Sequence, residues 1–528
     1  MLLFSKIKSV KFACLLFLFT SISVIGLQSP TVPAENISLN YDLLEFNIKV
    51  EDLELFAKQG KVTNELNFYL KRISPERREE LKEFLNQSFD VNPVLIYRYS
   101  RTSVGIKILK RIGEIIQTPH NINGFYGLRG ALIQTAAASG KVSLIEFLKN
   151  YPTEIQINLP ELLKLIQQIT KEEETTANFI KALQQKSIGT KQDFNTDLDL
   201  ANKGNYGAIK QTLEFYDTKR DRKIVTDLYL PQKKSDSIPL ILVSNGLGAK
   251  RSRFSGLAQY LTSHGFAVVI PDHPGSDSQR QKDFLKGLYK ENFAATDFID
   301  RPLDISYILD ELEKINSNKL QKKLNLKQVG IFGYSIGGTT ALSLAGAEIN
   351  FDKLEKDCSQ PLSLFNISTL YQCRALELDK KQPSLKDARI KAAYMFVPFG
   401  NSMFSEEQLN KVNIPTMIQV VDRDFLTSLL VEQIPLFNSL NSSDSFLVVS
   451  EKLPHSNVTL SKEKQAVQGE IFQIARDYQK MLSLIFFQNY IAENKAYKPY
   501  LTTEYLQEVA QEPYNLHLVN EAITIENE

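Results

Sequence analysis

A glycine-flanked serine between an apolar segment and a helical segment is the feature that most constrains the fold of this chain. Residues 329–332 have the apolar pattern of a buried strand, and residues 339–345 have the pattern of a helix. Between them stands Gly333-Tyr334-Ser335-Ile336-Gly337. In so tight a turn, side chains two positions from the serine would crowd the strand and the helix, and the two glycines relieve that crowding. The pattern predicts that Ser335 lies exposed at the carboxyl end of a strand, where a substrate can reach it.

Short apolar segments alternate with helical segments throughout residues 203–528. This alternation predicts an α/β domain, a sheet with helices on both faces. Residues 209–216 and 223–230 flank a polar turn and predict a hairpin. A long helix, 462–490, is expected near the end of the domain. The other predicted strands have the near-continuous apolar composition of strands covered on both faces: 239–244, 267–271, 328–332, 392–397, 416–421 and 446–449.

The part of the chain before residue 203 has a different pattern of apolar and polar residues. Residues 35–165 predict a mainly helical N-terminal domain, in which Ser74-Pro75-Glu76 is a helix start with a capping serine and a proline in the first turn. Residues 166–202 are polar and predict a linker with some helix.

The first residues are typical of an export signal. Lys6, Lys8 and Lys11 precede an apolar run over residues 12–26, and Val32-Pro33-Ala34 offers a small-residue cleavage site. We therefore expect residues 1–34 to be a signal peptide and the protein to be exported, to the periplasm or the extracellular space. The alternative is an uncleaved membrane anchor, for which the apolar run is short. Peripheral membrane contact stays open.

The cysteines and the charge balance bear on the compartment and the partners. Of the three cysteines, removal of the signal would remove Cys14 and leave Cys358 and Cys373. An oxidising compartment would allow this pair to form a disulfide, and two buried free thiols are the alternative. The formal net charge is +1, and no basic stripe of the kind that nucleic-acid binders carry is found. We expect no nucleic-acid partner, and the sequence leaves the oligomeric state open.

A serine nucleophile needs a base, which is normally a histidine. Where the serine stands on such a turn, the acid and the histidine follow it in the chain. Of the five histidines, only His455 and His517 follow an acid downstream of Ser335. His455 lies in a loop after a predicted strand and is the expected base, whereas His517 is predicted on the surface. His273 precedes Ser335 and could line the pocket, and His264 is predicted to end a helix.

The remaining parts of the predicted site are an acid and two oxyanion donors. Asp422 and Asp424 both follow the predicted strand 416–421, and either could orient the histidine. The backbone N–H of Ile336, directly after the serine, is one expected oxyanion donor. The second is the N–H of Leu247, in a loop flanked by glycines. No cluster at metal-ligand spacing is found, and the chemistry needs no metal and no cofactor.

Several of these segments resemble the platelet-activating-factor acetylhydrolase and dienelactone-hydrolase-like branch of the α/β-hydrolases. In that branch the acid stands just before a segment ending in Glu-Gln-Ile, so the resemblance selects Asp424, with Asp422 in reserve. Asn245 stands where the branch usually has histidine. The segments that carry the resemblance are 244–248 (Ser-Asn-Gly-Leu-Gly), 263–266 (Ser-His-Gly-Phe), 272–276 (Asp-His-Pro-Gly-Ser), 301–305 (Arg-Pro-Leu-Asp-Ile), 333–338 (Gly-Tyr-Ser-Ile-Gly-Gly) and 432–434 (Glu-Gln-Ile).

The N-terminal part also has a counterpart. Residues 53–61 and 124–129 resemble an uncharacterised domain that precedes hydrolases in cyanobacteria. The two resemblances together imply an α/β-hydrolase sheet preceded by a helical domain.

The sequence as a whole predicts a serine hydrolase that cleaves small-molecule or lipid esters through an acyl-enzyme. Residues 346–390, between the nucleophile helix and the next strand, are long for a connection and are expected to form a cap over the site, pinned by Cys358 and Cys373. Two alternatives remain. The triad serves an amidase or peptidase equally well, and the scaffold could be a catalytically silent binding protein.

Overall fold

The computed structural model describes residues 33–41, 44–186, 198, 200–233, 237–318, 323–455 and 465–524. The described residues divide into two compact units. The first comprises residues 33–175 and 283–292, and the second comprises the others up to 524, with residue 465 grouped with the first. The predicted signal, 1–34, falls almost entirely outside the described residues.

The first unit combines helices with a small sheet. Strands run in the order β2-β1-β7-β4-β5, and β3 pairs with β6 separately. The strands are β1 (Asn36–Tyr41), β2 (Leu44–Lys49), β3 (Ser88–Asp90), β4 (Ile116–Thr118), β5 (Ile122–Asn123), β6 (Lys141–Ser143) and β7 (Ile155–Asn158). The helices are α1 (Val50–Gln59), α2 (Asn64–Leu70), α3 (Pro75–Asn86), α4 (Pro93–Tyr99), α5 (Ser103–Gly113), α6 (Phe125–Ser139) and α7 (Leu144–Lys149).

The predicted helical character of this unit is found, but its sheet was not predicted. Strands β1 and β2 each alternate apolar and polar residues over six positions, a strand signal that the sequence prediction did not use. The other strands of this unit have only two to four residues, too few for such a pattern to be clear. The predicted start of α3 is as expected, because the Ser74 hydroxyl accepts a hydrogen bond from the Arg77 amide and Pro75 takes the first helical position. Helix α6 ends at Gly140, whose φ of 67° is in the left-handed region.

Helix α8 (Leu159–Lys186) extends into residues 166–202, for which the sequence predicts a linker with some helix. Its residues Leu165, Ile169, Ile180 and Leu183 are buried, so this polar stretch has an apolar stripe at helical spacing. The first part of the predicted linker is therefore a continuous helix, and residues 187–197 lie outside the described residues.

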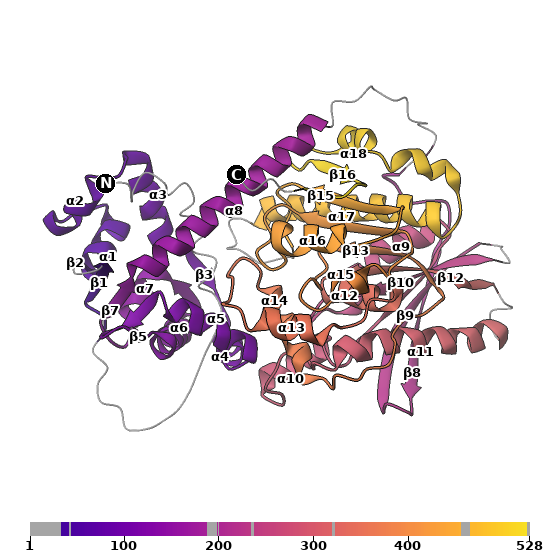
Figure 1. The fold of residues 1–528 in the computed structure, drawn as a ribbon, viewed down its shortest axis with the longest axis horizontal. Helices are drawn as coiled ribbons and strands as arrows, with labels where there is room; N and C mark the ends of the chain where they lie inside the picture. Colours follow the sequence, from indigo (N-terminus) through magenta and orange to yellow (C-terminus); the bar gives the residue numbers. More distant parts are fainter. Residues whose placement is uncertain are drawn as a thin grey trace. The chain divides into compact units, whose positions relative to one another are not determined.

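The second unit is built on a nine-stranded sheet in the order β16-β15-β14-β13-β12-β10-β11-β9-β8 (Figure 1). The six strands from β15 to β11 run parallel to one another. Strand β16 pairs antiparallel with β15, β9 pairs antiparallel with β11, and β8 pairs antiparallel with β9. The strands are β8 (Ala208–Asp217), β9 (Arg222–Pro231), β10 (Ile238–Ser244), β11 (Ala267–Pro271), β12 (Leu324–Tyr334), β13 (Ile390–Phe396), β14 (Thr416–Val421), β15 (Ser445–Ser450) and β16 (Leu516–Val519).

Helices cover both faces of this sheet, as the sequence predicts. Helices α11 and α12 contribute to the apolar core on one face, and α9 and α17 contribute to the core on the other. The helices after β10 are α9 (Ser255–Ser263), α10 (Ser278–Lys286), α11 (Asp297–Asn318), α12 (Ile336–Ala345), α13 (Phe351–Cys358), α14 (Ser368–Gln372), α15 (Glu406–Leu409), α16 (Ile434–Asn438), α17 (Gln465–Tyr490) and α18 (Thr503–Val509). Short 3-10 or π-helical turns are η2 (Arg251–Phe254), η3 (Cys373–Glu377), η4 (Leu429–Gln433) and η6 (Lys495–Tyr500).

The edges of the sheet show where the sequence prediction succeeded and failed. The predicted hairpin is β8 and β9, which pair antiparallel over their whole length. Strand β16 at the opposite edge was missed. It is four residues long and is held in place by pairing with β15, which lies far away in the sequence.

Residues 346–390 form the predicted insertion between α12 and β13, with α13, α14 and η3. A disulfide joins Cys358 to Cys373, as predicted. The amides of Ile367 and Ser368 donate to the carbonyl oxygens of Phe425 and Leu426, at 3.2 and 2.7 Å. The insertion is therefore attached to the loop that follows β14.

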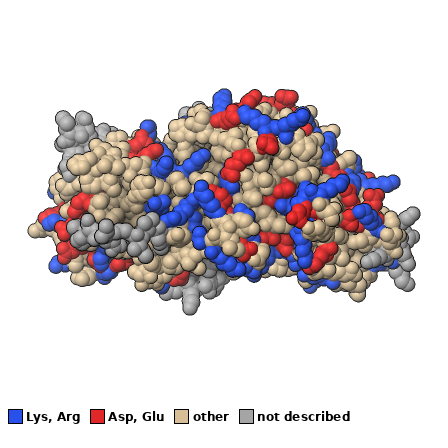
Figure 2. All heavy atoms as spheres, turned by 90° about the horizontal axis from the view of Figure 1, so that it is seen from below, with Lys and Arg blue, Asp and Glu red and all other residues tan. Residues whose placement is uncertain are grey.

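Charges of both signs are interspersed among the described residues on the face shown in Figure 2, in keeping with the formal net charge of +1. Of the helices that the structure describes, none combines the length and the apolar character needed to cross a membrane.

We expect removal of the disulfide to destabilise the second unit. The bond closes a loop with a sequence separation of 15, and loss of such a loop restraint costs about 3 kcal/mol through the unfolded state. Chemical denaturation of a Cys358→Ala/Cys373→Ala variant should show this loss. Reductant should bring the wild type to the stability of the variant and leave the variant unchanged, and equal stability of both oxidised proteins would contradict the prediction.

Candidate active site

Ser335 lies at the junction of β12 and α12 with an unusual backbone conformation. Its φ is 54° and its ψ is −120°, a region that costs a residue with a side chain about 1–3 kcal/mol. Packing on both sides holds it there. The Ser335 amide donates to the carbonyl oxygen of Phe396 in β13 at 3.0 Å, and the amide of Gly338 donates to the Ser335 carbonyl oxygen at 2.7 Å. The serine side chain is half-buried.

The two flanking glycines are required by close backbone contacts. A Cβ at Gly333 would lie 2.3 Å from the carbonyl oxygen of Gly337, and a Cβ at Gly337 would lie 2.0 Å from the carbonyl oxygen of Ser244. Real Cβ atoms do not approach that closely. The crowding expected from the sequence is therefore present, and Gly337 also allows α12 to approach the end of β10.

Asp424 and His455 come together from loops after neighbouring strands. Asp424 follows β14 and His455 follows β15, and Asp424 Oδ2 lies 2.5 Å from His455 Nδ1. The aspartate side chain is only 1% exposed and the histidine side chain 12%. The Tyr334 hydroxyl donates to the carbonyl oxygen of His455 at 3.0 Å, which anchors the histidine loop to the residue directly before Ser335.

The structure distinguishes Asp424 from Asp422. The amides of Leu426 and Thr427 donate to Asp424 Oδ1, at 2.8 and 3.1 Å, and the Thr427 hydroxyl donates to Oδ2 at 2.6 Å. These bonds fix the carboxylate toward the imidazole. Asp422 instead accepts a bond from the Lys452 amide at 2.7 Å, and burial raises the pKa of its carboxyl group.

The loop over residues 244–248 lies beside the serine. A Cβ at Gly246 would lie 2.5 Å from the ring of Tyr334, so glycine allows the loop to pack against this ring. Gly248 has a φ of +70°, in the left-handed region that favours glycine. Neither the Leu247 amide nor the Ile336 amide donates to another residue among those described. The Ile336 amide is at the first position of α12, where helical N–H groups lack intrahelical partners.

Among the described residues, no hydrogen bond joins the Ser335 hydroxyl to the imidazole of His455. Catalytic hydrogen bonds are commonly long before a substrate is bound. Beside His455 lies a cavity with apolar and cationic side chains. It is lined by Arg253, Phe254, Gly256, Leu257, Tyr334, Phe396, Pro454, His455, Phe472, Ala475, Arg476, Gln479 and Lys480.

The other histidines have structural surroundings. His264 ends α9, as predicted. The prediction of a surface position for His517 was wrong, because it is 2% exposed in β16 and its Nε2 lies 2.7 Å from Glu451 Oε1. His273 is buried, with its Nε2 3.0 Å from the Ser244 hydroxyl. Burial and the nearby charge of Arg301 lower the pKa of His273 to about 4.

Comparisons with known proteins agree with this architecture. Residues 239–353 match the family model described as alpha/beta hydrolase fold, and residues 33–158 match the one described as alpha/beta hydrolase of unknown function (DUF1400). The chain carries an α/β-hydrolase fold. It is also 27% identical over 151 residues to platelet-activating factor acetylhydrolase of Cavia porcellus. That similarity covers 23% of this chain and 35% of the relative, so the chain matches about a third of that relative's length.

In this α/β-hydrolase fold, sequence reasoning missed the buried charges behind the 244–248 loop. Asp297, Arg301 and Asp304 are all at most 1% exposed. The signal that could have found them is their spacing of four and three residues, which places three charges on one helical face. Charged side chains at such spacing normally lie on a solvated face, which is why the pattern alone was not informative.

We expect Gly337→Ala to destabilise the second unit by about 1–3 kcal/mol, because its Cβ would overlap the Ser244 carbonyl oxygen. Gly469→Ala in α17 is the matched control. A Cβ at Gly469 meets nothing within 4 Å, so helix propensity should stabilise that variant by up to about 1 kcal/mol. Denaturant unfolding measures both variants, and a Gly337→Ala protein as stable as the wild type would contradict the close approach.

We expect His273 to make the protein less stable in acid. Its pKa is about 4 in the folded state against an ordinary value of 6.5, so the unfolded state binds more protons between these values. The stabilisation that the folded state gains from neutral His273 is present above pH 6.5, and it is lost as the pH falls toward 4. Between pH 7 and pH 4.5, the wild type should lose about 2 kcal/mol more than a His273→Gln variant. The free energy of unfolding of both proteins is measured in urea at each pH. An equal decrease in the two proteins between pH 7 and pH 4.5 would contradict the predicted role of His273.

Proposed function

We propose that this protein is a serine hydrolase that cleaves carboxylic esters through an acyl-enzyme on Ser335. The observation that carries the proposal is the Asp424–His455 pair, whose Oδ2 and Nδ1 atoms lie 2.5 Å apart. The hydroxyl of Tyr334, the residue directly before Ser335, binds the carbonyl oxygen of His455. A strained serine on a strand-to-helix turn, a histidine and a buried carboxylate are the three groups that this chemistry needs. The hydrolase family matches support hydrolase activity in general.

The mechanism follows from the positions of these groups. Ser335 Oγ attacks the ester carbonyl carbon while His455 Nε2 accepts its proton. Asp424 accepts the hydrogen bond from His455 Nδ1–H, which fixes the tautomer and stabilises the imidazolium that forms. The amides of Leu247 and Ile336 donate to the oxyanion. His455 then gives the proton to the leaving alcohol. Water attacks the acyl carbonyl carbon while His455 accepts its proton, and His455 returns that proton to Ser335 Oγ as the carboxylic acid leaves.

The expected substrates are short-acyl or lipid-like esters. Phe254, Leu257 and Phe396 give the cavity beside His455 apolar walls, which suits an acyl or alkyl chain. The name of the Cavia porcellus relative, an acetylhydrolase, favours a short acyl group. Export to the periplasm or the extracellular space belongs to the same proposal, and the disulfide is compatible with it.

A fluorophosphonate probe and two aspartate variants test the proposal. We expect wild-type protein to be labelled on Ser335 and to hydrolyse p-nitrophenyl esters. Asp424→Asn should lower kcat by about 10³–10⁴-fold, because the amide favours the wrong histidine tautomer. Asp422→Asn is the matched control, since it keeps an oxygen for the Lys452 amide and does not contact His455, and its kcat should be close to that of wild type.

Peptide mapping of the labelled protein and steady-state kinetics supply the two readouts. Absence of label on Ser335 in the folded wild type would overturn the enzyme proposal in favour of a silent binding protein. An equal decrease of kcat in Asp424→Asn and Asp422→Asn would overturn the role of Asp424. Paired ester and anilide substrates of graded acyl length separate an esterase from an amidase, and faster cleavage of the anilides would overturn the ester assignment.

A further inference from the structure

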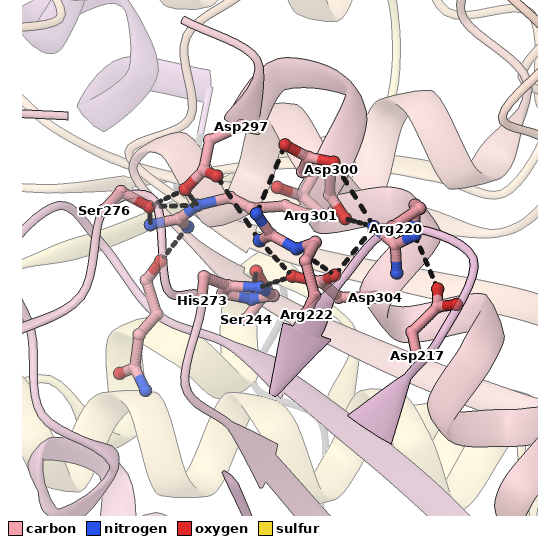
Figure 3. Close-up of polar contacts among 12 residues, drawn as sticks. Asp217, Arg220, Arg222, Ser244, His273, Ser276, Asp297, Asp300, Arg301 and Asp304 are labelled. Carbon is pink, nitrogen blue, oxygen red and sulfur yellow. Dashed lines mark hydrogen bonds and ion pairs between the residues drawn. The ribbon is translucent and has the colours of Figure 1, made fainter. Parts of the chain in front are cut away.

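A network of buried charges is hydrogen-bonded to the 244–248 loop, and Figure 3 shows its side chains together with Ser244. Helix α11 contributes Asp297, Arg301 and Asp304, which point to the same side and are 0, 1 and 0% exposed. Arg222 at the start of β9 binds Asp304 through two hydrogen bonds, at 3.0 and 2.8 Å. These residues belong to the second unit and lie outside the Ser335, His455 and Asp424 triad.

Arg301 binds the loop directly at one end. Its Nη1 donates to the carbonyl oxygen of Asn245 at 2.5 Å, two residues before Leu247. The Leu247 amide is one of the two oxyanion donors of the proposed mechanism, so a shift at residue 245 would displace that donor. The side chain of Arg301 is among the largest that are fully buried in the structure.

Arg301 binds the other end of the loop through Ser276. Its Nε and Nη2 donate to Ser276 Oγ at 2.8 and 2.5 Å. The Ser276 carbonyl oxygen in turn accepts the Gly248 amide at 2.8 Å, one residue after Leu247. One guanidinium group therefore restrains the chain on both sides of the proposed oxyanion donor.

Asp297 holds Arg301 and Ser276 in this arrangement. It accepts a hydrogen bond from the Ser276 hydroxyl, and its Oδ2 lies 3.5 Å from Arg301 Nε. Burial raises the pKa of the Asp297 carboxyl group to about 6. A Cβ at Gly275 would lie 2.0 Å from Asp297 Oδ1, so a glycine is needed for the loop containing Ser276 to approach the carboxylate.

A second branch of the network reaches the residue at the start of the loop. Asp304 Oδ2 lies 3.5 Å from His273 Nδ1, and His273 Nε2 lies 3.0 Å from the Ser244 hydroxyl. Burial opposes ionisation of Asp304, but the bonds from His273 and Arg222 hold the pKa of its carboxyl group below the usual value. Residues 244, 245 and 248 are thus all connected to the network by hydrogen bonds.

The cost of burying these charges indicates a role beyond stability. Apolar side chains of similar volume commonly stabilise a protein as well as a buried ion network does, or better. An oxyanion donor, by contrast, must be held in place before the reaction because its contribution depends on preorganisation. Arginine suits this task because its planar fork donates in several fixed directions, which the single ammonium group of lysine cannot reproduce.

We propose that Arg301 is a positioning residue that holds the Leu247 amide toward the oxyanion by binding Asn245 and Ser276. This inference rests on the proposed function, since it concerns the oxyanion donor of that site. It assigns to Arg301 an effect on the transition state of the reaction and not on binding of the ground-state ester.

The test compares Arg301→Lys with Arg389→Lys. Arg389 is the matched control because it also donates to carboxylates, Asp387 and Asp310, and to a backbone carbonyl oxygen, that of Ser306. It lies directly before β13, at the amino end of the strand and away from Ser335. Ser276→Ala is a second test variant, which keeps the bond from Arg301 to Asn245 and removes the connection through the hydroxyl.

Three measurements are made on the full-length protein. The first is hydrogen exchange of the peptide covering 245–249, which needs no activity and should be faster in Arg301→Lys than in wild type or Arg389→Lys. The second is the inhibition constant of a trifluoromethyl ketone, whose hemiketal oxyanion occupies the same donors. We expect this constant to rise about 10- to 100-fold, with kcat falling by a similar factor and KM unchanged. The third is the thermal midpoint, which should fall in both lysine variants.

The outcomes separate the inference from the proposed function. The positioning role would be overturned if Arg301→Lys and Arg389→Lys showed the same hydrogen exchange in peptide 245–249 and the same inhibition constant for the ketone. A rise in the KM of Arg301→Lys without a fall in its kcat would also overturn it. If Arg301→Lys does not fold, Ser276→Ala must show the same effects at a smaller size, and its failure to do so overturns the inference. An inactive wild type that is unlabelled at Ser335 would overturn the proposed function, while the exchange measurement would still decide whether Arg301 holds the loop.

Discussion

The close approach of backbone segments around Ser335 is the constraint on which the rest of the second unit depends. Gly333 and Gly337 allow α12 to begin immediately after β12 and to reach the carbonyl oxygen of Ser244 at the end of β10. This brings the serine, the Ile336 amide and the 244–248 loop to one place. The strained backbone at Ser335 persists because the strand on one side and the helix on the other are both buried and leave no room to relax.

The parallel strands explain how the other side chains reach the same place. Strands β10, β12, β14 and β15 run parallel, so the loops at their carboxyl ends meet at one edge of the sheet. Asp424 and His455 follow two adjacent strands, and their loops need only a few residues to bring a carboxylate to an imidazole. The Tyr334 hydroxyl connects the histidine loop to β12, so the three elements are held to one another by bonds that do not involve a substrate.

The loop after β10 is supported differently from the serine. Two of its backbone hydrogen bonds end on the buried Arg301 of α11 and on the Ser276 loop. A charged network in this position can restrain several backbone atoms from one side, which an apolar packing surface cannot do because it offers no directional bonds. The cost is the desolvation of these charges, seen in the low pKa of His273 and the raised pKa of Asp297.

The sequence by itself determined the strand-to-helix turn at Ser335, the α/β alternation, the hairpin of β8 and β9, and His455 as the expected base, because these depend on local pattern and chain order. The residue pattern left Asp422 and Asp424 both open, and the family resemblance favoured Asp424. The tertiary structure shows that Asp424 contacts His455. It also decided that Asp297, Arg301 and Asp304 are buried and that His517 belongs to an edge strand. Burial of a charge depends on partners far away in the chain, such as Asn245 and Arg222, and no local pattern specifies them.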